Sequence, residues 1–188
     1  MLRTVVLAAA LLIAPPALAQ ASPPANPFPH VTDASITEPD GDRVLQLWID
    51  VPATPDVVWR AWTTAEGWKS FAVRHALVDF RVGGRIETSY AESFTPGAPS
   101  NIVNEVIAYV PGRMLTIRNV QAPPGFEHAA EFARTATTIE MFAVDGGTRV
   151  VVTGTGFVPG PAYDTLFQRF KTGNSWTLEK LRERLAAR

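Results

Sequence analysis

The C-terminal segment most constrains the fold, because its pattern predicts one long amphipathic helix from about Pro161 to Ala187. Large side chains recur there at steps of three and four, which places them on one stripe of a helix. They are Tyr163, Phe167, Phe170, Asn174, Leu178, Leu181 and Leu185. At about 1.5 Å per residue the helix is roughly 40 Å long. It is therefore long enough to lie across an entire curved sheet.

One residue interrupts the apolar stripe. Asn174 is polar, and an amide buried without hydrogen bonds costs roughly 1–3 kcal/mol. One interpretation is structural, with Asn174 bonded to a strand backbone or a buried water. The other is that Asn174 faces a cavity and binds a ligand there.

Alternating apolar residues predict the first strand, from Arg43 to Val51. The turn at 40–42 that precedes this strand allows Ala34–Thr37 to pair back as a short extra strand. After it, Thr54 is expected to cap a helix that begins at Pro55. A second short helical turn is expected over 66–71.

A run of hairpins follows the two short helices. The expected strands are 76–82, 85–93, 102–109, 113–119, 136–144 and 148–157, and Gly-containing turns join them in pairs. The order of strand, two short helices, hairpins and one long helix predicts an α+β fold with about six or seven strands.

The first 19 residues resemble a secretory signal peptide. Arg3 gives the positive start, residues 5–14 form a short apolar stretch, and Ala17-Leu18-Ala19 gives the small-residue cleavage pattern. The apolar stretch is too short to span a bilayer, which takes roughly 20 residues. We therefore expect cleavage, export to a bacterial periplasm, and no membrane span in the mature chain.

The segment that follows is rich in proline. Residues 20–33 are expected to form an extended leader that does not pack by itself. Residues 34–188 then form a single domain, a length that suits one hydrophobic core.

Composition excludes several functions. The chain has no Cys, which removes disulfides, thiolate metal sites and thiol catalysis, and its net charge of −1 gives no basic face for nucleic acid. His75 and Asp79 are too far apart on a strand, at about 13 Å, to share a metal ion. The glycines at 154, 156 and 160 do not have the spacing of a dinucleotide loop. We expect no cofactor and no metal.

Four motifs together resemble the SRPBCC (START-like) superfamily, in its branch related to the heat-shock-protein-90 ATPase activator. They are VPATPDVVWRAWT at 51–63, DFRVGGR at 79–85, PGRML at 111–115, and the terminal pattern of Phe170, Gly173, Asn174, Trp176, Leu178 and Leu181. The resemblance covers about residues 43–186.

This resemblance implies a helix-grip fold, in which a curved antiparallel sheet wraps the long C-terminal helix around a deep cavity. Members of the superfamily bind lipids, polyketides or other apolar molecules there, and some cyclise or hydrolyse them. A chaperone-activating role does not fit an exported chain, because the cytosolic chaperone and ATP are both absent outside the cytosol.

Three hypotheses follow. The first is an exported, non-catalytic protein that binds a small apolar ligand, with the wall of its cavity formed by Trp68, Phe71, Phe80, Tyr90, Met141, Phe167, Phe170 and Asn174. The second is a cyclase or hydrolase in which His75, Glu105 or Tyr90 assists proton transfer, although Glu105 is expected in solvent. The third is an interaction module with exposed Trp68 and Phe126. The sequence specifies neither the ligand nor the oligomeric state.

Overall fold

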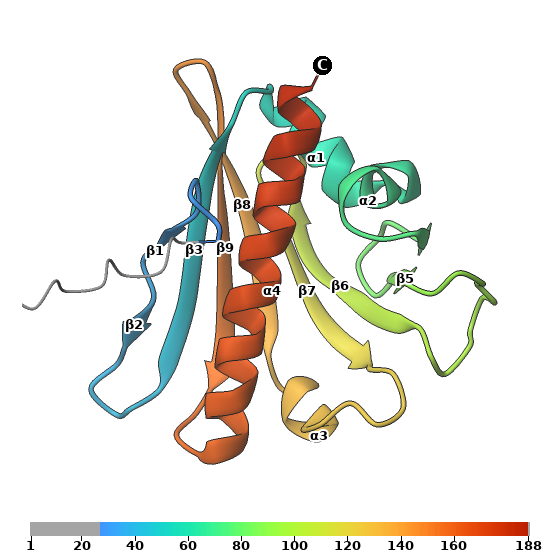
Figure 1. Cartoon of the computed structure of the whole chain (residues 1–188), viewed down its shortest axis with the longest axis vertical. Helices are drawn as coiled ribbons and strands as arrows, with labels where there is room; N and C mark the ends of the chain where they lie inside the picture. The colour runs from blue at the N-terminus through green and yellow to red at the C-terminus, as the bar shows by residue number, and fades with distance from the viewer. Residues whose placement is uncertain (1–26, 188) are drawn as a thin grey trace, which may run out of the picture.

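An antiparallel sheet curves behind one long helix in the computed structural model, which describes residues 27–187 (Figure 1). The helix is α4 (Pro161–Ala186), and its observed ends agree closely with the predicted ones. The α+β class is confirmed. The predicted signal peptide and most of the leader lie outside the described residues.

Within residues 27–187 the sheet has nine strands in the order β1-β3-β9-β8-β7-β6-β5-β4, with β2 paired to β3. The chain runs as a meander from β4 to β9, and β3 then pairs with β9. The strands are β1 (Thr32–Asp33), β2 (Ile36–Thr37), β3 (Arg43–Val51), β4 (His75–Val78), β5 (Arg85–Ser89), β6 (Ile102–Val110), β7 (Met114–Gln121), β8 (Ala136–Val144) and β9 (Gly147–Phe157).

The core forms where α4 lies against β3 and β9. In β3 every second residue is buried, as the alternation predicts; these residues are Leu45, Leu47, Ile49 and Val51. From the helix, Leu166, Leu178, Leu181 and Leu185 are buried against the same region. Burial of an aliphatic side chain contributes roughly 1.5–3 kcal/mol, so this contact fixes the helix on the sheet.

Two short helices, α1 (Pro55–Thr63) and α2 (Ala65–Phe71), lie beside one end of the sheet (Figure 1). The expected cap at Thr54 is not formed, because its side chain makes no capping hydrogen bond. Thr64 instead caps α2 by accepting a hydrogen bond from Gly67 N at 3.0 Å. A further helical turn, α3 (Ala129–Phe132), was not predicted.

β2 confirms the short extra strand that was expected within Ala34–Thr37, because it pairs back on β3. The strand count still exceeds the expected six or seven, because β1 and β2 have two residues each, too few to show alternation. The first hairpin is also shorter than predicted, since β4 ends at Val78 and β5 ends at Ser89. The chain between them turns tightly at Gly84, where a Cβ would lie 2.1 Å from the carbonyl oxygen of Asp79.

Residues 27–33, which we call the N-terminal strap, lie against α4 and β3. The His30 backbone N–H donates to Glu179 Oε1 at 2.7 Å, and its Nδ1 lies 3.0 Å from Glu179 Oε2. Asp33 forms an ion pair with Lys171. Proline content alone does not predict these contacts. Within residues 27–187, no helix is long and apolar enough to cross a membrane.

Candidate functional site

The helix α4 contacts β3 and β9 but leaves a cavity of about 640 Å³ over β6, β7 and β8. This volume lies within the range of about 300–1,000 Å³ that is typical of small-molecule sites. Side chains from the sheet, α1, α2, α4, the α3 region and the N-terminal strap form the wall. They include Phe28, Trp62, Trp68, Tyr90, Ile102, Asn104, Ile117, Asn119, Phe126, Phe132, Thr137, Ile139, Arg169, Phe170, Gly173, Asn174 and Trp176.

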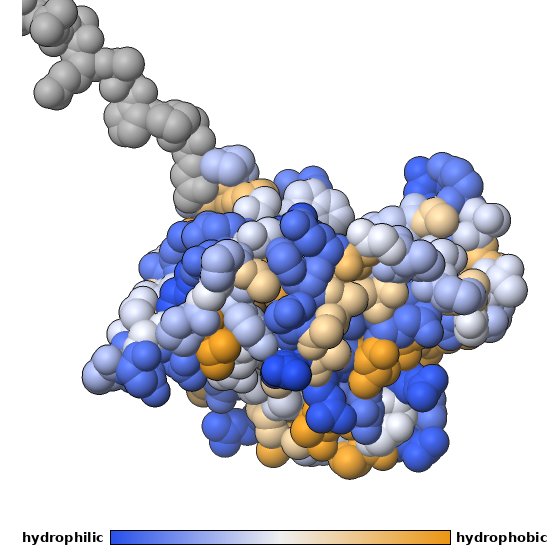
Figure 2. Space-filling model, turned by 90° about the horizontal axis from the view of Figure 1, so that it is seen from below, coloured by the Kyte–Doolittle hydropathy of each residue, from blue (hydrophilic) through white to orange (hydrophobic). Residues whose placement is uncertain are grey.

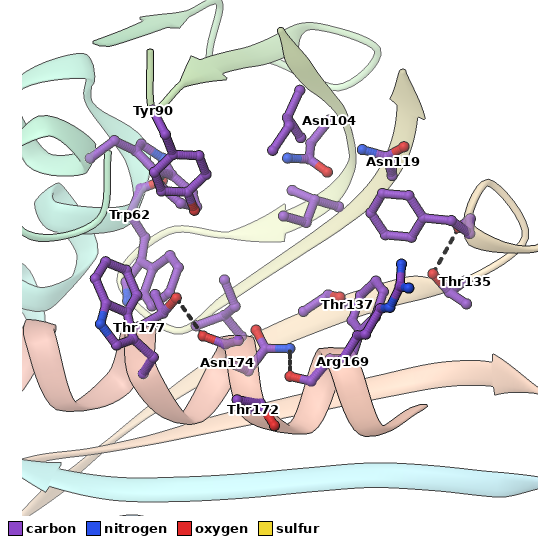
Figure 3. Close-up of a pocket in the computed structure, with 18 of the residues that line it drawn as sticks. Trp62, Tyr90, Asn104, Asn119, Thr135, Thr137, Arg169, Thr172, Asn174 and Thr177 are labelled. Carbon is purple, nitrogen blue, oxygen red and sulfur yellow. Dashed lines mark hydrogen bonds between the residues drawn. The ribbon is translucent and has the colours of Figure 1, made fainter. Parts of the chain in front are cut away.

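Aromatic side chains line the part of the cavity next to α1 and α2. Trp62 and Trp68 pack edge to face with ring centroids 5.1 Å apart. Trp68 Nε1 donates to the Trp62 carbonyl oxygen at 2.8 Å, which fixes the Trp68 ring. Trp62 Nε1 is also buried but bonds no described residue. Tyr90 lies over this part of the wall (Figure 3).

Polar side chains line the part of the cavity formed by β6, β7 and β8. Asn104 and Asn119 are direct cross-strand partners, and they lie next to each other (Figure 3). Asn119 Nδ2 donates to the carbonyl oxygens of Val103 at 3.3 Å and Gln121 at 3.0 Å. Thr137 adds a hydroxyl group from β8. These residues form a polar row across three adjacent strands.

A cluster of three phenylalanine rings closes the wall near α3. Phe126, Phe132 and Phe170 pack in sequence, with centroid distances of 5.1 and 4.9 Å. Arg169 lies beside them; its Nη2 forms an ion pair with Glu127, and its guanidinium lies 5.7 Å from the Phe126 ring centroid. The positive charge at this part of the wall is therefore paired with a carboxylate.

Four of the eight predicted wall residues line the cavity: Trp68, Tyr90, Phe170 and Asn174. The other four do not. Phe71 packs behind Trp62 at 5.3 Å, and Phe167 packs against Phe157 at 5.3 Å. Phe80 contacts Tyr109 at 4.8 Å. Met141 is buried two residues beyond Ile139 on β8, a step of about 7 Å along a strand that takes it past the cavity.

Asn174 combines the two roles that the sequence left open. Its Nδ2 donates to the Phe170 carbonyl oxygen at 2.9 Å, one turn earlier in α4. Its side chain also lines the cavity, with the amide oxygen turned away from the helix backbone (Figure 3). The structural partner is the helix itself, and neither a strand nor a water is needed.

Only one of the three candidate acid–base residues faces the cavity. His75 lies outside it, stacked on Phe94 at 5.3 Å, and Glu105 forms an ion pair with Arg118 at 3.1 Å. Tyr90 lines the wall but is 56% exposed, and the partial burial of its hydroxyl raises the pKa above the ordinary value of 10.0. A neutral phenol with a raised pKa is a poor base near pH 7. No cluster of three metal-ligating side chains occurs within residues 27–187.

The exposed aromatic residues of the third hypothesis are not exposed. Trp68 is only 8% accessible, and Phe126 is half-buried against Phe132. On the face seen in Figure 2, hydrophobic side chains occur in separate groups with hydrophilic ones between them. This surface therefore gives little support for a protein-docking face.

Sequence reasoning missed the polar row on the sheet. Alternation in β7 places Leu115, Ile117 and Asn119 on one face, so Asn119 could have been identified there. In β6 the alternation was ambiguous, because Val103 and Val106 are both buried. The register shift between Val103 and Asn104 places its extra residue on β7, at Val120, so β6 keeps its period of two here. Ile102 and Asn104 therefore share the face that lines the cavity, and Glu105 does not.

A curved antiparallel sheet, a long C-terminal helix and a cavity between them define an SRPBCC-type helix-grip domain. The chain belongs to the family described as activator of Hsp90 ATPase homolog 1-like protein, whose model matches residues 52–186. This confirms the resemblance seen in the motifs. A comparison with curated protein sequences finds no match.

Solved structures share the fold. A protein named MLL2253 from Mesorhizobium loti is 21% identical, with a TM-score of 0.61 over 77% of this chain and 98% of that one. The Aha1 dimer from Colwellia psychrerythraea is 17% identical, with a TM-score of 0.60 over 76% and 95%. CalU16 from Micromonospora echinospora is 18% identical, with a TM-score of 0.56 over 81% of each chain. Identities this low establish the fold alone.

Proposed function

We propose that the protein is exported and holds one small apolar molecule in the cavity between α4 and the strands β6 to β8. The main support is the cavity itself, which combines a volume of about 640 Å³ with a wall that is mostly aromatic and aliphatic. Cavities with a mostly apolar wall and a small number of polar groups are typical binding sites for small organic molecules.

The absence of a second acid–base group favours binding over catalysis. Among the described wall residues only Tyr90 and Arg169 are titratable, and Arg169 is paired with Glu127. General acid–base catalysis uses a group whose pKa lies near the working pH. The cyclase or hydrolase hypothesis therefore rests on Tyr90 alone.

Binding is tested with native mass spectrometry of protein purified without detergent, followed by titration with 1-aminoanthracene, a neutral apolar dye. We expect a co-purifying molecule in a one-to-one complex, or an empty protein that binds one dye molecule with micromolar affinity. An empty protein that also fails to bind the dye would contradict the proposal.

Export is tested separately, because it depends on residues outside the described part of the chain. The full chain is produced in a Gram-negative host, and the intact mass is measured in the periplasmic and cytosolic fractions. We expect a periplasmic form that begins at Gln20, directly after the Ala17–Ala19 pattern. Uncleaved protein confined to the cytosol would refute export and leave the binding proposal intact.

A further inference from the structure

The orientation of Asn119 is fixed by the sheet. The residue is 5% exposed, and its Nδ2 donates both of its hydrogens, to the carbonyl oxygens of Val103 and Gln121. Both donors of the amide group are therefore used. The remaining group, Oδ1, is an acceptor and bonds none of the residues 27–187.

Asn174 repeats this arrangement on the opposite wall. Its Nδ2 donates to the Phe170 carbonyl oxygen, so this hydrogen bond determines which end of the amide is the nitrogen. Its second amide hydrogen and its Oδ1 bond no residue of the described chain. The sheet and the helix thus each contribute to the cavity wall one amide whose Oδ1 is unpaired.

The amide of Asn104 and the hydroxyl of Thr137 add to this unsatisfied polar surface. Both residues line the cavity, and the side chains of both lack a hydrogen-bond partner among residues 27–187. Since a desolvated polar group without a partner costs roughly 1–3 kcal/mol, an apolar ligand that covered these groups would bind at a disadvantage. A ligand with a matching polar group would recover that cost.

The charge of the wall further restricts which polar group a ligand can carry. Arg169 is the only cationic residue of the wall among the described residues, and its guanidinium is paired with Glu127. A carboxylate ligand would therefore be desolvated without a free cation to pair with it. Burial of an unpaired charge costs far more than burial of a neutral polar group.

We propose that the cavity selects neutral ligands whose polar end both donates and accepts hydrogen bonds, as a hydroxyl or a primary amide does. Such a group donates to the Oδ1 atoms of Asn119 and Asn174 and accepts from the amide of Asn104 or the hydroxyl of Thr137. The inference rests on the proposed function and specifies the class of ligand. The rest of such a ligand is apolar and lies along the aromatic part of the wall, next to Trp62 and Trp68.

Three probes that share one skeleton test this selectivity: 4-(naphthalen-2-yl)butanamide, its methyl ester analogue methyl 4-(naphthalen-2-yl)butanoate, and the free carboxylate. The amide is neutral and donates, the ester is neutral and only accepts, and the acid is charged at pH 7.5. We expect the amide to bind about 10-fold or more tightly than either of the others, measured by isothermal titration calorimetry.

Substitutions test whether the preference for the amide probe depends on the side chains of Asn119 and Asn174. Asn174→Leu keeps the size of the side chain and loses only a hydrogen bond within its own helix, so the fold is expected to persist. We expect it to reduce the preference for amide over ester to about 3-fold or less. Asn119→Leu has the same expected effect, but it also removes two bonds to strand backbone. Thr165→Val is the matched control: it also removes a side-chain hydrogen bond to a carbonyl oxygen of the same helix, but it lies outside the cavity wall and leaves the preference unchanged.

Each outcome has a distinct meaning. Equal binding of the amide and the ester, or tightest binding of the carboxylate, would overturn the inference and leave the proposed function standing. A selectivity that Asn174→Leu does not alter would also overturn it. Failure of all three probes and of 1-aminoanthracene would refute the proposed function, and the inference with it.

Discussion

The two halves of the sheet differ in how closely they pack against the same helix. Along β3 and β9, α4 lies in contact with the strands, and leucines and phenylalanines fill the space between them. Over β6, β7 and β8 the helix and the strands diverge, and the cavity takes the place of a core. One helix therefore packs into the core on one side and lines the cavity on the other.

The residues of α4 reflect this division. The packed side presents Leu166, Leu178 and Leu181, which are fully buried. The cavity side presents Gly173, Asn174 and Thr177, which are too small or too polar to fill the space. A glycine inside a helix costs about 0.5–1 kcal/mol relative to alanine. One side of the helix therefore stabilises the fold, and the other side lines the cavity. Substitutions on the two sides should accordingly have different effects on stability and on ligand binding.

The largest effect is expected on the packed side. Leu178→Ala removes a fully buried side chain and is expected to lower the free energy of unfolding by about 2–5 kcal/mol. The neighbouring Thr177→Ala, on the cavity side, should lower it by about 0.5 kcal/mol or less. Urea denaturation of both variants checks this. Equal losses would contradict the division of the helix.

A smaller difference in stability is expected between substitutions of two tryptophans in the cavity wall. Trp68→Phe removes the hydrogen bond to the Trp62 carbonyl oxygen, whereas Trp62→Phe removes a buried Nε1 that has no partner among the described residues. Both substitutions lose similar volume. Trp68→Phe is therefore expected to be less stable than Trp62→Phe by about 1 kcal/mol in urea denaturation. The reverse order would show that the Trp62 nitrogen is satisfied.

The smallest effect lies where β3 pairs with β9. Arg149 bonds both oxygens of Asp50 at 2.8 Å, and this hydrogen bonding lowers the pKa of Asp50 below its ordinary value of 3.8. The stabilisation is therefore complete above that value and is lost as the pH falls through the lower pKa of the folded protein. Because the pair is half-exposed, its contribution to stability is small.

Asp50→Asn provides the measurement for this ion pair. The variant should be slightly less stable than the native protein at pH 7, and the difference should shrink as the pH falls below 3.8 and through the lower pKa of the folded protein. Denaturation curves at pH 7, 5 and 3 give the comparison. A difference as large at pH 3 as at pH 7 would assign the effect to packing against Trp48, over whose ring the Arg149 guanidinium lies at 3.9 Å.

The packed side was predictable from the sequence, and the cavity only in part. Alternation in β3 and the three- and four-residue steps of α4 report directly on which side chains are buried. These patterns do not show where the helix and the sheet separate to leave a cavity. In sequence, Phe167 and Met141, which pack in the core, therefore cannot be distinguished from Phe170, which lines the cavity. Asn174 was identifiable because a polar residue interrupted an apolar stripe. Asn104 was not, because both alternating sets of positions in β6 contain buried apolar residues, so the sequence does not show which face lines the cavity.

The central claim is that the space beside Gly173 is a binding cavity, and filling it is the most direct test. A Cβ at Gly173 would meet no atom within 4 Å, so a side chain can enter the cavity without a clash at its base. Gly173→Leu is expected to fold with at least native stability and to weaken binding of 1-aminoanthracene about 10-fold or more, since steric filling removes the site. Gly173→Ala is the control and should bind as the native protein does. Native affinity in a well-folded Gly173→Leu variant would contradict the account.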